Sequence, residues 1–104
     1  YAEIADAGGG IVSTVAAVRA VSPEALVEQS RRRLRALMAG GVTTVEVKSG
    51  YGLDTANEVK LLEAARLLGE SEPVRIVPTL LAAHAVPAGA DRDAFVSEIV
   101  GEMI

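Results

Sequence analysis

Two short segments with the pattern of β-strands, separated by a helical pattern, constrain the fold of this chain more than any other feature. In residues 42–48, Val45 and Val47 alternate with polar residues, which is the period of two that a strand requires. Residues 74–81 are rich in β-branched and aliphatic side chains and predict a second strand. Because an intervening helix returns the chain to the same edge of a sheet, the two strands are expected to be parallel neighbours with a right-handed crossover.

Helical patterns surround both predicted strands. Ser22 and Pro23 predict the start of a helix, and Gly40 with Gly41 predicts its end. Its buried side would carry Leu26, Val27, Leu34, Leu37 and Met38. Residues 1–7 are typical of the last turns of an earlier helix, which the glycine run 8–10 would end. Residues 11–19 fit no single pattern.

The other two predicted helices follow the strands. Thr55 and Glu58 stand at the spacing of a capping box, and Gly69 is expected to end that helix. Its apolar side would carry Val59, Leu62, Ala65 and Leu68. A last helix follows Asp91, with Phe95, Val96, Ile99, Val100 and Met103 on one side. This order of elements fits an open doubly wound sheet or one sector of an α/β barrel, and 104 residues are too few for the ~250 of a complete barrel.

Composition excludes several classes of function. The net charge of −4 argues against binding nucleic acid or an anionic membrane through a basic face. The longest stretch without charge, residues 76–90, contains two prolines and is too short to span a membrane. The absence of cysteine excludes a disulfide framework and a thiolate metal site, and it is consistent with a reducing cytoplasm.

Tyr51 and His84 are the candidate site residues. Reactive groups of parallel α/β proteins gather where strands end, and these two side chains follow the two predicted strands. We therefore expect the phenol and the imidazole to lie side by side. The alternatives are a turn tyrosine that packs on the surface and a buried histidine with satisfied hydrogen bonds. A metal-ligand role for His84 is disfavoured because the chain has no second histidine.

Two further features have less functional meaning. Glu46 and Lys48 lie two residues apart on one strand face and predict an interior ion pair, with a catalytic acid and base as the alternative. The glycine run 8–10 lacks the spacing of a dinucleotide or P-loop fingerprint and predicts a tight bend.

The sequence strings around these sites resemble those of the imidazolonepropionases, in the amidohydrolase superfamily. The likeness rests on Gly-Gly-Gly-Ile at 8–11, on Gly-Val-Thr-Thr-Val-Glu-Val-Lys-Ser-Gly-Tyr-Gly-Leu at 41–53 and on Ala-His-Ala-Val-Pro at 83–87. It extends over essentially all 104 residues and marks them as an internal stretch of a longer catalytic domain. The resemblance implies a partial TIM-like (β/α)8 barrel of the amidohydrolase type, with about two βα units plus flanking helices.

The same resemblance implies an activity and a substrate site. The complete enzyme would hydrolyse 4-imidazolone-5-propanoate to N-formimidoyl-L-glutamate in histidine degradation, in the cytoplasm and as a homodimer. In that family, the residues that match Tyr51 and His84 bind the substrate, and Tyr1 matches a tyrosine near the pocket less firmly. The metal, zinc or iron, would be held by ligands upstream of Tyr1 and downstream of Ile104. The segment alone is therefore expected to carry no metal ligand and no catalytic residue, and to be inactive.

Two other functions stay open at this point. Another metal-dependent amidohydrolase, such as a cyclic amidine deaminase, would keep the barrel and change the pocket. A non-enzymatic flavodoxin-like ligand-binding domain would bind a phosphate at the start of the helix at Thr55. A fragment with open sheet edges could also pair with copies of itself.

Overall fold

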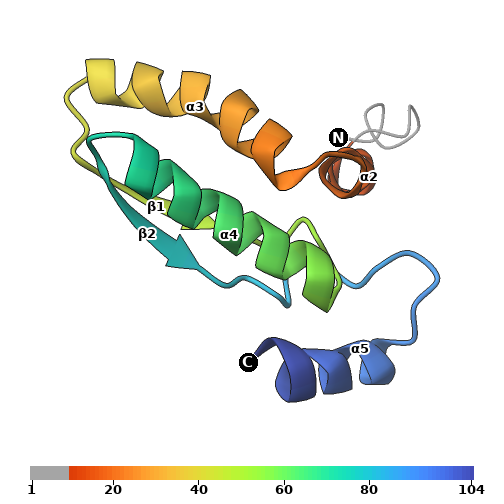
Figure 1. The fold of residues 1–104 in the computed structure, drawn as a ribbon. Coiled ribbons are helices and arrows are strands. Elements are labelled where there is room, and N and C mark those ends of the chain that lie inside the picture. Colours follow the sequence, from red (N-terminus) through yellow and green to blue (C-terminus); the bar gives the residue numbers. More distant parts are fainter. Residues whose placement is uncertain (1–9) are drawn as a thin grey trace.

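The structure, a computed structural model, describes residues 10–104 as a mixed α/β arrangement (Figure 1). Its elements in chain order are α2 (Ile11–Ala20), α3 (Pro23–Ala39), β1 (Thr44–Lys48), α4 (Thr55–Ser71), β2 (Arg75–Thr79), α5 (Arg92–Glu98) and the π-helix η1 (Ile99–Met103). The predicted alternation of helices and strands is confirmed. Residues 11–19, which fit no pattern in the sequence, lie in helix α2. The helix predicted over residues 1–7 lies outside the described residues.

Strands β1 and β2 form a parallel two-stranded sheet, as predicted. Lys48 lies opposite Thr79, so both strands end at the same edge of the sheet. Each strand is shorter than the sequence indicated. The extension of β2 ends because the N–H of Leu81 donates to the Ser49 hydroxyl oxygen, at 3.0 Å, and leaves the backbone ladder.

A first hydrophobic core joins α3, α4 and the sheet, with α3 and α4 side by side in Figure 1. Its buried members are Val27, Leu34, Ala64, Leu68 and Val74. Most of the predicted buried side of α3 is confirmed, but Leu37 is 47% exposed. The reason is helical spacing, because the stripe that faces α4 steps by seven and then four residues through positions 27, 34 and 38.

A second core lies beyond the strand ends, where the loops meet α5 and η1. Its buried members are Leu53, Ala82, Phe95 and Ile99. The prediction for the last helix is wrong at Val96 and Val100, which are 49% and 67% exposed. Because residues four apart share one helix face, the buried stripe continues from Phe95 through Ile99 to Met103 and leaves the two valines beside it.

The helix ends differ from the predictions in two places. Ser22 caps α3 as predicted, and its hydroxyl accepts from the N–H of Ala25. The cap of α4 is Asp54 and not Thr55, and Glu58 does not complete a capping box. Gly69 does not end α4, which continues to Ser71. A Cβ added at Gly69 would lie 3.2 Å from the Cβ of Ile76, so this glycine allows close packing of α4 on β2.

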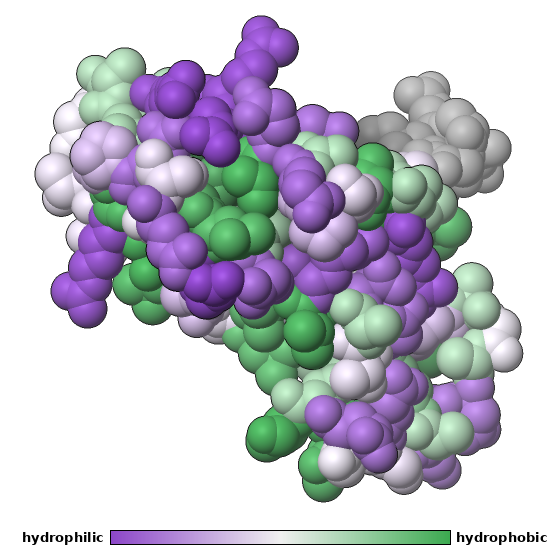
Figure 2. Space-filling model, in the orientation of Figure 1, coloured by the Kyte–Doolittle hydropathy of each residue, from purple (hydrophilic) through white to green (hydrophobic). Residues whose placement is uncertain are grey.

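Hydrophobic groups also remain at the surface, where Figure 2 shows them between polar regions. The exposed large side chains include Val77, Leu81, Val100 and Ile104. Within residues 10–104, no helix has the length and hydropathy that a membrane span needs.

Candidate functional site

Tyr51 and His84 lie side by side beyond the strand ends, as the sequence predicted. Their ring centroids are 5.0 Å apart and the ring planes are tilted by 58°. This distance and tilt are within the range of favourable aromatic pairs. Tyr51 is half-buried, whereas His84 is exposed, so His84 is not the buried histidine that the sequence left as an alternative. The pair presents one hydroxyl and one imidazole at the same end of the sheet.

The turn that carries Tyr51 is built around the carboxylate of Glu58. Glu58 is 1% exposed, and its Oε2 accepts from the N–H of Gly50 at 2.8 Å. Its Oε1 accepts from the N–H groups of Gly52 and Leu53 at 2.8 and 2.9 Å. Both neighbours of Tyr51 are therefore fixed by one side chain. The capping-box spacing did not predict this role of Glu58, although a glutamate on the buried side of a helix was the available signal.

The turn after β1 also contacts the segment that carries His84. The N–H of Ser49 donates to the Thr79 carbonyl oxygen at 3.0 Å. Gly50 has a φ of +111°, and a Cβ at this position would lie 3.0 Å from the His84 Cβ and from the Leu81 carbonyl oxygen. Only glycine adopts this backbone and leaves this space without strain. The two loops are consequently in close contact.

Arg19 of α2 holds the far side of the same turn. Its Nε donates to the Gly52 carbonyl oxygen at 2.8 Å, and its Nη2 donates to that of Leu53 at 3.2 Å. The same guanidinium lies 3.0 Å from a carboxylate oxygen of Asp54. Arg19 donates to carbonyl oxygens of the turn and Glu58 accepts from its N–H groups, so side chains bind both the donors and the acceptors of this backbone.

The predicted pair of Glu46 and Lys48 is present on the sheet face opposite α4. Their charged atoms are 3.5 Å apart, which confirms the ion pair, and within the described residues the two side chains are 50% and 55% exposed. The α4 side of the sheet is covered and the opposite side is open, which explains the exposure. The Thr79 hydroxyl donates to Glu46 at 2.8 Å and holds the pKa of that carboxyl below its ordinary value, and Lys48 acts in the same direction.

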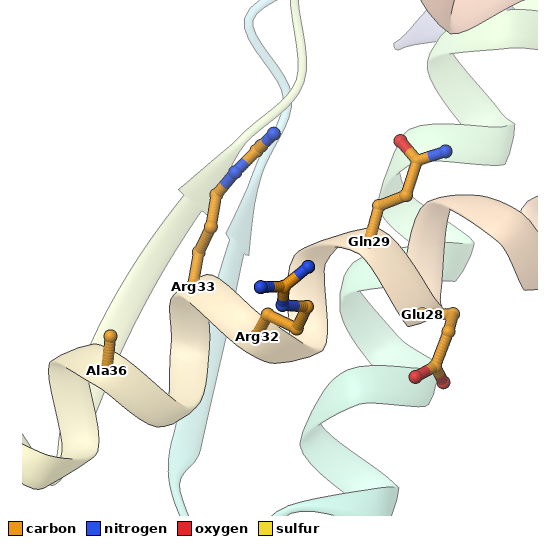
Figure 3. Close-up of a pocket in the computed structure, with 5 residues that line it drawn as sticks. All are labelled: Glu28, Gln29, Arg32, Arg33 and Ala36. Carbon is orange, nitrogen blue, oxygen red and sulfur yellow. The ribbon is translucent and has the colours of Figure 1, made fainter.

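Of two cavities considered as sites, one lies close to the loops of Tyr51 and His84 and the other does not. One of about 300 Å³ lies between α2 and the loops, and it is lined by Leu53 and by residues 86–88, which follow the candidate residues along the chain. A more open one of about 580 Å³ is lined by Glu28, Gln29, Arg32, Arg33 and Ala36. Figure 3 shows that all five of these side chains come from α3. This second cavity is a groove along one helix, and it contains neither candidate residue.

The start of α4 is unsuited to the phosphate that a flavodoxin-like domain would bind. An anion site at a helix start needs free N–H groups. The N–H of Asn57 donates to Asp54 at 2.8 Å, and the N–H of Thr55 donates to Glu98 at 3.0 Å. In the turn before α4, the N–H groups of Gly50, Gly52 and Leu53 donate to Glu58. Carboxylates of the chain therefore already accept from several of the N–H groups that a phosphate at this helix start would need.

The Tyr51–His84 pair offers groups that form hydrogen bonds at the end of the sheet. A phenol donates one hydrogen bond, and a neutral imidazole offers one donor and one acceptor. No group of three or more His, Asp or Glu side chains that could hold a metal ion occurs within the described part of the chain. These residues therefore do not fit a metal centre by themselves. The position of Tyr1 lies outside the described residues.

Comparison with known proteins finds close relatives along the whole chain. It is 55% identical over 104 residues to the imidazolonepropionase of Stenotrophomonas maltophilia and 57% identical over 106 residues to that of Pseudomonas syringae pv. tomato. Each match covers 100% of this chain and 26% of the relative. A third, from Pseudomonas entomophila, is 61% identical over 87 residues, which are 84% of this chain and 22% of the relative.

A scan against protein-family models gave no match. The pairwise matches are nevertheless strong, and at this level of identity they establish common ancestry. The chain spans about a quarter of the length of the curated relatives it matches. The resemblance to the imidazolonepropionases is thereby confirmed over all 104 residues, as a match to a quarter-length segment of those proteins.

Proposed function

We propose that this chain is part of an imidazolonepropionase, which hydrolyses 4-imidazolone-5-propanoate to N-formimidoyl-L-glutamate. The single observation that supports this most is the 55% identity to a protein of that name along the whole chain. In the proposed enzyme, the two βα units form one sector of a TIM-like (β/α)8 barrel of the amidohydrolase type. The parallel register of β1 and β2 and the exposure of Val77 on the sheet face opposite α4 support this sector.

Tyr51 and His84 are proposed to bind the substrate. Hydrolysis of an imidazolone begins with attack of water on the ring carbonyl carbon, so negative charge develops on the carbonyl oxygen. An imidazole N–H from His84 that points at this oxygen would stabilise the charge. The Tyr51 hydroxyl would donate to the ring or to the propionate and orient the attacked carbon. The 5.0 Å separation of the two rings supports contact with a single small molecule.

The complete enzyme is proposed to be cytoplasmic and homodimeric and to use zinc or iron. A bound metal supplies a water molecule of lowered pKa. Because residues 10–104 contain no group of side chains suited to a metal, these residues are assigned to binding and orienting the substrate.

The test uses the complete enzyme that contains this segment, with His84→Ala and Tyr51→Phe variants. Each is expected to lower kcat/KM for 4-imidazolone-5-propanoate by about tenfold or more, since a lost donor at a developing charge commonly costs that much. Gln29→Ala, on the exposed face of α3, is the control and should retain full activity. Loss of less than about twofold in both site variants would refute the binding roles. A complete enzyme without turnover of this substrate would refute the proposed function.

A further inference from the structure

Burial of the Glu58 carboxylate is expected to lower the stability of the fold unless other groups compensate its charge. Burial of a charge without compensation is strongly unfavourable. None of the ion pairs described within residues 10–104 includes Glu58, and its compensation comes from the three backbone N–H groups of Gly50, Gly52 and Leu53. A well-packed apolar side chain is often no worse for stability than a buried charge. What a carboxylate adds is the orientation of the N–H groups around it.

Those three N–H groups surround Tyr51 in the sequence. One carboxylate oxygen accepts from the N–H of Gly50, and the other accepts from the N–H groups of Gly52 and Leu53. Bonds to a charged acceptor are shorter and stronger than neutral ones, and these lie between 2.8 and 2.9 Å. The backbone of Tyr51 is thus held on both sides, which limits the directions that its side chain takes.

The hydrogen bonds of Glu58 also affect the position of His84, because Gly50 packs against the loop that carries it. Gly50 is buried between Glu58 and the second loop, with so little space that a Cβ would lie 3.0 Å from the His84 Cβ. Ser49, directly before it, accepts from the N–H of Leu81 at 3.0 Å and is 2% exposed. A displacement of Gly50 would therefore move the loop of His84 as well.

We propose that Glu58 is a positioning residue for the substrate-binding pair, because its carboxylate holds the turn that sets the geometry of Tyr51 against His84. Glu58 does not touch the substrate in this proposal. It acts through the backbone of residues 50–53, and it determines how well the phenol and the imidazole engage one molecule together. The inference rests on the proposed function of that pair.

The chain offers a matched control in Glu72. This glutamate is also buried, with 5% of its side chain exposed, and it also accepts three hydrogen bonds, from Arg31 and Arg35. Those bonds join α3 to the end of α4 and do not involve the turn. Substitution of either glutamate by glutamine removes one buried charge at nearly constant volume. The two variants therefore separate a general loss of stability from a loss of positioning.

In the complete enzyme, Glu58→Gln is expected to lower kcat/KM for 4-imidazolone-5-propanoate by about tenfold or more, since small misplacements of binding groups have effects of this size. Glu72→Gln is expected to stay within about twofold at a temperature where both variants are folded. In a Tyr51→Phe background, Glu58→Gln should cause a smaller fold loss than in the wild-type enzyme, because the two residues act on one contact. Independent, multiplicative losses, or equal losses in both glutamine variants, would overturn the proposal.

A measurement without a variant covers the case in which Glu58→Gln fails to fold. With ¹⁵N-glycine labelling of the wild-type enzyme, the amide protons of Gly50 and Gly52 should resonate at low field and exchange slowly, as expected for bonds to a buried carboxylate. Rapid exchange of these amides would overturn the positioning role. If the wild-type enzyme does not turn over the substrate, the proposed function fails, and the amide result still decides whether Glu58 holds the turn.

Discussion

Substitution of Gly50 by alanine tests the close contact between the two loops of the candidate site. An added Cβ would lie 3.0 Å from both the His84 Cβ and the Leu81 carbonyl oxygen. Non-bonded carbon atoms prefer separations of about 3.5–4.0 Å, so the loop of His84 must move by roughly half an ångström or more. Gly50 also has a φ of +111°, which is unfavourable for any residue with a Cβ.

The expected loss in the free energy of unfolding of Gly50→Ala has two parts, one from the backbone and one from overpacking, and a control variant separates them. Gly41 has a similar φ of +92°, but a Cβ there would have nothing within 4 Å. Gly41→Ala should therefore lower the free energy of unfolding by the backbone cost alone, about 1–2 kcal/mol. Gly50→Ala should lose this amount and about 1–3 kcal/mol more from overpacking. The difference between the two variants measures the contact with His84 and Leu81.

The assays are urea unfolding followed by circular dichroism and steady-state kinetics in the complete enzyme. We expect Gly50→Ala to lower kcat/KM by about tenfold or more, whereas Gly41→Ala leaves it unchanged, because a misplacement of about 1 Å at a site is costly. Equal unfolding free energies for both variants, within about 0.5 kcal/mol, would show that Gly50 is not closely packed against the second loop.

Three further predictions concern the scaffold. Leu34→Ala in the first core should lower the free energy of unfolding by about 2–5 kcal/mol, and a loss below about 1 kcal/mol in urea unfolding would contradict the described packing. Arg35 holds the pKa of Glu72 below its ordinary value of 4.5, so this carboxylate stabilises the fold above that pH and the stability is lost as the pH falls through the lowered pKa. Urea unfolding at pH 7 and pH 3 should accordingly show a smaller acid loss in Glu72→Gln than in the wild type. Asp91→Ala, at the cap of α5, should cost about 1 kcal/mol and Asp91→Asn much less, as thermal unfolding would show.

The parts of the fold that sequence predicted depend on local patterns. Alternation along β1, the glycine turns and the cap at Ser22 are each set by neighbouring residues, and a parallel pair follows from the length of the connection. The adjacency of Tyr51 and His84 follows in turn, because both side chains lie on loops that follow paired strands ending at the same edge of the sheet. Their roles toward a substrate remain predictions.

The parts that sequence did not predict depend on contacts between distant residues. Thr55 and Glu58 fit a capping box, but Asp54 lies one position earlier and supplies the cap, which leaves Glu58 free to turn toward residues 50–53. The buried stripe of α4 consequently includes Glu58 in place of Val59, which is 57% exposed. Local spacing alone does not distinguish these two arrangements.

Helix α2 has few buried contacts with the rest of the structure, which predicts that it unfolds first. None of its side chains is fully buried, and Val15 alone is among the residues packed against the second core. Its carboxyl end is joined to α4 by Lys60, whose Nζ donates to the carbonyl oxygens of Val18 and Val21 at 2.9 and 3.0 Å. Helix α2 is held mainly by hydrogen bonds from charged side chains to carbonyl oxygens, so it should unfold before the two hydrophobic cores. Its backbone amides should therefore exchange first under native conditions. Arg19 belongs to this helix, so unfolding of α2 would break the hydrogen bond from Arg19 to the Gly52 carbonyl oxygen. The hydrogen bond from the Gly52 N–H to Glu58 would remain.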